Sequence, residues 1–125
     1  MTGLSPYGED QVLTPLITTA FVSLHTGDPG NTGASEVATT GGTNYGRLSA
    51  AFTKAPGASN TVASNTSILT YSAAGTSWGT VTHFGIWDQA TGGNFRGGNI
   101  VNTPKAVNVN DTARFAAGAL TITAT

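Results

Sequence analysis

The chain has 125 residues, a formal net charge of −1, charged side chains at 9% of positions and no cysteine. This length fits one domain with a single core, and the lack of cysteine excludes disulfides and thiolate metal sites. The five cationic residues are scattered, so we expect no nucleic-acid partner. No signal-peptide pattern and no run of about 18 apolar residues occurs, so we expect no membrane partner and synthesis in the cytoplasm.

Residues 1–17 are expected to form an N-terminal arm or short helix, separate from the domain that follows. Ser5-Pro6 is a good helix start, with proline at the first helical position, and Pro15 would end the helix at Thr14. The segment forms either a short amphipathic helix that covers one end of the core or an extended arm. In the second case we expect a partner-facing surface made by Met1, Leu4 and Tyr7.

Residues 18–125 have the pattern of an all-β fold. Runs rich in Val, Ile, Thr and aromatic residues recur about every 10–15 positions and are separated by Gly, Asn and Asp. Such spacing is typical of a single β-sandwich or jelly-roll-like domain. The expected strands are residues 18–25, 45–53, 60–64, 67–72, 80–87, 94–101, 104–109, 112–116 and 119–124.

Two hairpins and a core follow from this pattern. Residues 88–93 are expected to join two strands through Gly92-Gly93, and Asn110-Asp111 to join the strand with Val107 and Val109 to the next one. Alternation places the apolar residues of the half-buried strands on one face. The expected core is Leu24, Leu48, Phe52, Ile68, Phe84, Ile86, Trp87, Phe115, Leu120 and Ile122.

The first strand runs into a long loop with several anchoring residues. Pro29 fixes φ and Gly30 allows a positive φ, so the strand must end before them. The loop carries Asp28 and Glu36 and returns at Tyr45 and Arg47. We expect the Arg47 guanidinium to bind a loop carboxylate and tie the loop to the sheet. Asp28 and Glu36 are then either turn formers and hydrogen-bond acceptors within the chain or contacts to a neighbouring subunit.

Candidate catalytic and metal-binding patterns are weak. Gly75-Thr76-Ser77-Trp78-Gly79 matches a nucleophile-elbow pattern, but a strand is expected after it where a helix is required, so we interpret it as a glycine-rich turn. His25 and His83 are expected to bind backbone or threonine partners and no metal. We therefore expect no catalytic residues, no metal and no cofactor. Trp78 is a candidate platform for stacking on a sugar ring.

Several motifs are similar to those of a known group of proteins. They are residues 24–30 (LHTGDPG), Glu36-Val37, Tyr45-Gly46-Arg47, residues 80–88 (TVTHFGIWD), Gly92-Gly93-Asn94 and residues 116–123 (AAGALTIT). The chain resembles small phage virion structural proteins described as tail-fibre-like or head decoration (cement) proteins. Pro6, Gly8 and Pro15 interrupt an N-terminal segment that is more cleanly helical in those proteins.

The resemblance implies a structural role in a virion and no enzymatic activity. Our first expectation is a decoration protein, made in the host cytoplasm, that binds the major capsid protein at the capsid surface as a homotrimer. Several moderate contacts per copy would then give tight retention. The alternative is a tail or tail-fibre module, which in one version has a glycan site at an exposed Trp78.

Overall fold

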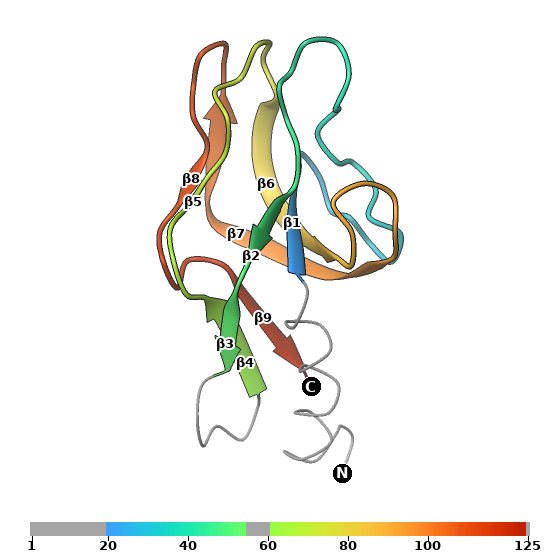
Figure 1. The fold of residues 1–125 in the computed structure, drawn as a ribbon, viewed down its shortest axis with the longest axis vertical. Coiled ribbons are helices and arrows are strands. Elements are labelled where there is room, and N and C mark those ends of the chain that lie inside the picture. Colours follow the sequence, from blue (N-terminus) through green and yellow to red (C-terminus); the bar gives the residue numbers. More distant parts are fainter. Residues whose placement is uncertain (1–19, 55–60, 125) are drawn as a thin grey trace.

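The computed structural model describes residues 20–54 and 61–124, and within these ranges every regular element is a β-strand (Figure 1). The expected all-β fold is therefore confirmed. The predicted arm or helix of residues 1–17, with its candidate interface residues Met1, Leu4 and Tyr7, lies outside the described residues.

The largest sheet has four antiparallel strands in the order β2-β1-β6-β7. They are β1 (Ala20–His25), β2 (Leu48–Ala50), β6 (Gly79–Trp87) and β7 (Phe95–Val107). β1 lies between two neighbours and is buried along most of its length. β7 is an edge strand of this sheet, and the expected hairpin at residues 88–93 joins it to β6.

One extended segment passes from the first sheet into a second sheet. β2 pairs with β1, and β3 (Phe52–Lys54) continues the same run after Ala51 but pairs with β4 (Thr61–Asn65). β9 (Thr121–Ala124) completes the order β3-β4-β9. The single strand expected at 45–53 is thus shared between two sheets.

A small two-stranded sheet corrects one predicted hairpin. β5 (Leu69–Thr70) pairs with β8 (Arg114–Phe115), so β8 does not pair with β7 as expected. A turn does occur at Asn110, which has a φ of 71°. The turn carries the chain away from the four-stranded sheet because the segment before β8 bonds to Ala74, whose N–H donates to the Asp111 carbonyl at 2.9 Å.

β7 also differs from expectation, since one strand replaces the two predicted around Pro104. In the pairing with β6, Val81 is opposite Lys105 whereas His83 is opposite Ile100, so the intervening β7 residues bulge out of the ladder. Proline has no N–H to donate and is tolerated at a bulge of an edge strand. The break in pairing that the sequence signals is therefore a bulge and not a strand end.

One hydrophobic core connects the three sheets, and eight of the ten expected core residues are members of it or, like Trp87, buried beside it. Leu48 is only partly buried and packs against this core. The prediction that Ile68 belongs to the core is wrong, because this residue is 52% exposed just before β5. Val109 also breaks the expected alternation and is 54% exposed, since the chain has left β7 at that point.

Candidate functional site

The loop from Thr26 to Asn44 begins with a tight turn at the end of β1. The Asp28 carboxylate accepts a hydrogen bond from the Gly30 N–H at 2.9 Å, and Gly30 has a φ of 60°. The Pro29 carbonyl accepts hydrogen bonds from the N–H groups of Gly33 and Ala34, each at 3.0 Å. Pro29 and Gly30 therefore end the strand as predicted, and Asp28 acts as a turn former.

The far side of the loop returns to β1 through main-chain bonds. The Thr26 N–H donates to the Ser35 carbonyl and the Val37 N–H donates to the Leu24 carbonyl, both at 3.0 Å. Glu36 lies between them in an isolated bridge to His25. These bonds hold the loop close to the sheet and place the Glu36 side chain within reach of Arg47.

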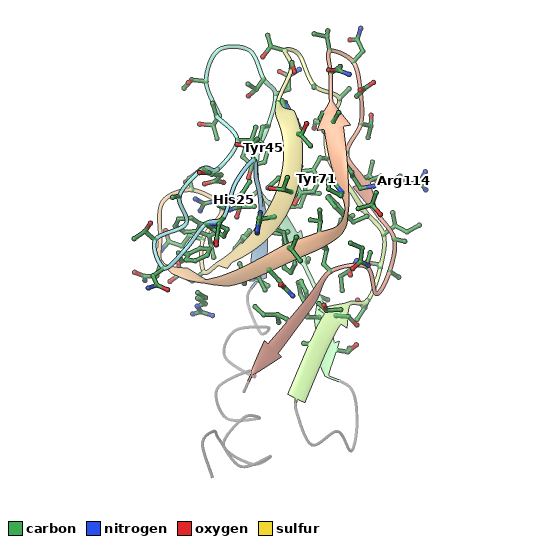
Figure 2. The ribbon with its side chains drawn as sticks, turned by 180° about the vertical axis from the view of Figure 1, so that it is seen from behind. His25, Tyr45, Tyr71 and Arg114 are labelled. Atoms are coloured by element: carbon green, nitrogen blue, oxygen red, sulfur yellow. The ribbon has the colours of Figure 1, made fainter. Side chains whose placement is uncertain are left out.

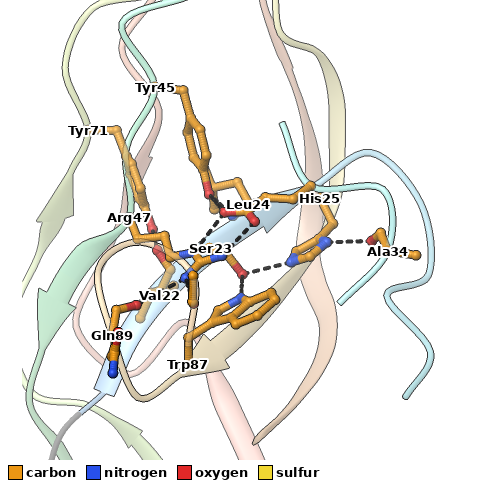
Figure 3. Close-up of polar contacts among 12 residues, drawn as sticks. Val22, Ser23, Leu24, His25, Ala34, Tyr45, Arg47, Tyr71, Trp87 and Gln89 are labelled. Atoms are coloured by element: carbon orange, nitrogen blue, oxygen red, sulfur yellow. Dashed lines mark hydrogen bonds and ion pairs between the residues drawn. The ribbon is translucent and has the colours of Figure 1, made fainter. Parts of the chain in front are cut away.

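Arg47 joins this loop to the β6–β7 hairpin. Its Nε and Nη2 donate to the two carboxylate oxygens of Glu36, each at 2.9 Å. Its Nη1 donates to the carbonyls of Gln89 at 3.0 Å and Gly92 at 2.8 Å, and its guanidinium lies 3.7 Å from the ring centroid of Trp87. We call this group the Arg47 clasp (Figure 3). The predicted pairing of Arg47 with a loop carboxylate is confirmed for Glu36.

The clasp is largely shielded from water. The side chains of Arg47 and Glu36 are 8% and 19% exposed. Burial raises the pKa of the Glu36 carboxyl, but hydrogen bonds from Arg47 and Tyr45 outweigh burial and hold this pKa below its ordinary value. The Tyr45 hydroxyl donates to Glu36 at 2.7 Å and accepts from the Leu24 N–H at 3.0 Å. Tyr45 thus anchors the end of the loop, as predicted.

A second polar network lies beneath the clasp in β1. The Ser23 hydroxyl is 2.7 Å from His25 Nε2 and accepts a hydrogen bond from Trp87 Nε1 at 2.9 Å. His25 Nδ1 is 2.7 Å from the Ala34 carbonyl, which can only accept, so Nδ1 carries the proton and Ser23 donates to Nε2. Burial lowers the pKa of His25, and its hydrogen bond to Ala34 opposes this shift.

This Ser–His contact has the separation of a nucleophile and its base. Both side chains, however, have 0% exposure, and the partner of Nδ1 is a carbonyl that holds the loop. No substrate can reach the hydroxyl in this arrangement. The pair is a structural device that joins β1, the loop and Trp87.

The prediction that Trp78 is an exposed platform for a sugar ring is wrong. Trp78 is only 5% exposed and its Nε1 donates to the Thr43 carbonyl at 2.8 Å. Its ring packs edge-on against the rings of Tyr45 and Tyr71, which are both buried. The ring completes the core and offers no free face for a sugar.

The remaining sequence candidates have local roles. Gly75 and Thr76 form a bend shortly before β6, so a strand and not a helix follows this pattern, as predicted. His83 lies beside the Thr82 hydroxyl at 2.8 Å. Among the described residues, no group of three His, Asp or Glu side chains is arranged to hold a metal ion. No helix in that part of the chain is long and apolar enough to cross a membrane.

A comparison with protein families shows to which family this chain belongs. Residues 8–123 match the model of the family described as Podophage GP4 fiber I protein gp80. The chain belongs to this family. No curated protein matches the chain.

Membership of the gp80 fibre family makes the chain a phage structural protein associated with the virion. The resemblance in the sequence is confirmed at this level. The description of the family favours the tail-fibre alternative over capsid decoration. Contacts of Asp28 and Glu36 with a neighbouring subunit stay predictions, and within the chain both Glu36 oxygens are occupied by the clasp.

Sequence reasoning missed several members of the site in this gp80-family chain. The sequence predicts a core position for Trp87, but its ring also supports Arg47, and no pattern in the sequence marks the carbonyls of Gln89 and Gly92. Ser23 did have a signal. It interrupts the apolar run of a strand that is buried on both faces, where a polar side chain needs a partner.

Proposed function

We propose that the chain is a module of a podophage tail fibre that acts through contacts with other molecules and not through catalysis. The observation that carries this proposal is the match of residues 8–123 to the gp80 fibre family. The Arg47 clasp supports it, because the clasp fixes two long surface loops against one end of the four-stranded sheet.

A fixed loop surface suits a protein that works by contact. Loops that are ordered before binding lose less conformational entropy when a partner arrives. Residues 38–42 and 89–94 are mostly exposed and carry Thr, Gly and Asn, which suits a polar contact surface. The exposed part of this surface forms one candidate contact region of the fibre module.

The absence of catalysis is part of the proposal. The Ser23–His25 pair is the arrangement most similar to a catalytic dyad in the described residues, and it is fully buried. The partners we propose are other fibre proteins, including further copies of this chain in a homotrimer. Several such contacts in one particle would add to tight retention, since each later contact is intramolecular.

Imaging of the virion tests this proposal. We expect electron microscopy of particles with a tagged copy of the chain to show the tag on the tail, and quantitative mass spectrometry to give a handful of copies per particle. A tag on the head with hundreds of copies would contradict the fibre role. That result would instead support capsid decoration with the major capsid protein as partner.

A further inference from the structure

A groove separates two strands that follow each other in the chain. β7 and β8 lie side by side in Figure 1 but belong to different sheets. Two hollows of about 250 and 350 Å³ share the side chains of Lys105 and Arg114 as lining. We call them together the β7–β8 groove. It is a surface with no role in the Arg47 clasp.

The groove has an excess of positive charge. Among the described residues, neither Lys105 nor Arg114 forms an ion pair, in contrast to Arg47. The Lys105 ammonium is 5.3 Å from the ring centroid of Phe115, and Arg114 projects from the edge of the molecule (Figure 2). The one acidic residue in the lining is Asp111, which accepts a hydrogen bond from the Asn108 N–H at 2.9 Å.

The rest of the lining narrows the chemistry of the ligand. Two cations are too few to follow the phosphates of a nucleic acid. The apolar side of the lining consists of Val101, Phe115, Ala116 and Ala119, and because Val101 and Phe115 are buried, it exposes little surface for the large apolar anchor of a protein partner. The uncharged polar residues of the lining are Asn102, Thr103 and Thr112, whose amide and hydroxyl groups are suited to sugar hydroxyls.

We propose that the β7–β8 groove binds a carboxylate-bearing sugar unit of a polysaccharide. Lys105 and Arg114 bind the carboxylate, and Asn102 and Thr103 bind neighbouring hydroxyls. This inference rests on the proposed fibre function, since it names a ligand class for such a module. It replaces Trp78, whose burial removes it as a sugar platform.

Titration of the full chain with oligogalacturonate, followed by amide NMR, tests the proposal. We expect shifts at residues 101–105 and 112–116, with a dissociation constant of about 1 mM, weakened by added salt. A neutral oligogalactose of equal length should give at least about tenfold weaker binding. Equal binding of the two sugars, or no shift with oligogalacturonate at about 10 mM, would overturn the proposal.

Charge variants identify the groove as the site. The double variant Lys105→Gln/Arg114→Gln should bind oligogalacturonate about tenfold more weakly, while Arg96→Gln, which removes a β7 cation outside the groove lining, should bind normally. Asp111→Asn should bind more tightly because it removes the one repelling carboxylate. Equal loss in the Arg96 variant would refute a specific site.

An acidic peptide distinguishes a sugar ligand from an acidic protein partner. If a poly-glutamate peptide binds as strongly as oligogalacturonate, the proposal of a sugar ligand is wrong and an acidic protein partner is favoured. The sugar titration uses purified protein, whereas the fibre role is tested on virions. A tag on the capsid would therefore refute the fibre proposal without changing the titration, and absent sugar binding would leave a tail location intact.

Discussion

The Arg47 clasp and the β7–β8 groove use the few charges of this chain in opposite ways. In the clasp, a buried guanidinium has its donor nitrogens matched by a carboxylate and two carbonyls. In the groove, two cations line an open hollow, and neither forms an ion pair among the described residues. The difference indicates that the clasp contributes to stability and the groove is available for binding.

Breaking the clasp should produce the largest effect. Arg47→Met leaves the Glu36 carboxylate largely buried without its cation and frees two carbonyls, so we expect a loss of about 3 kcal/mol in the free energy of unfolding. Urea denaturation measures this change. Arg114→Met, a matched change in the groove, should alter stability by less than about 0.5 kcal/mol. Similar losses in both variants would contradict the comparison.

The network under the clasp should have the next largest effect. Ser23→Ala leaves Trp87 Nε1–H and His25 Nε2 buried without partners, so we expect a loss of about 2 kcal/mol. Ser77→Ala is the matched control, because the Ser77 hydroxyl is exposed and makes only long hydrogen bonds of 3.3 Å. A loss below about 0.5 kcal/mol in the Ser23 variant would show that water replaces the hydroxyl.

Acid should weaken the clasp region. Burial depresses the pKa of His25 below 6.5, so under about pH 6.5 the unfolded chain binds a proton that the folded chain does not. Stability is therefore expected to fall as the pH decreases from 6.5 through the folded pKa. The depressed pKa of Glu36 adds a further loss below pH 4.5, continuing through its folded pKa.

Urea midpoints at several pH values measure this dependence. His25→Gln should remove the loss of stability that begins near pH 6.5 and keep the further loss at lower pH that is due to Glu36. If the urea midpoint of that variant still falls below pH 6.5 as in the unmodified protein, a group other than His25 is responsible for the loss of stability.

The smallest effect on folding should come from the groove. Lys105→Gln loses the contact of its ammonium with the Phe115 ring but leaves no buried group unpaired, so we expect a loss of at most about 0.5 kcal/mol. Thermal unfolding measures it. A large loss would show that Lys105 belongs to the stabilising part of the molecule, like Arg47.

The sequence by itself determined the all-β fold, most of the core and the anchoring of the long loop. These features depend on local rules: alternation of apolar residues, the Asp-Pro-Gly turn, and a single arginine placed after a loop that carries a carboxylate. The tertiary structure decided the rest. Trp78 became a core residue and β8 paired with β5, because burial and strand pairing depend on which distant segments meet. The groove between β7 and β8 follows from that pairing, which no local pattern encodes.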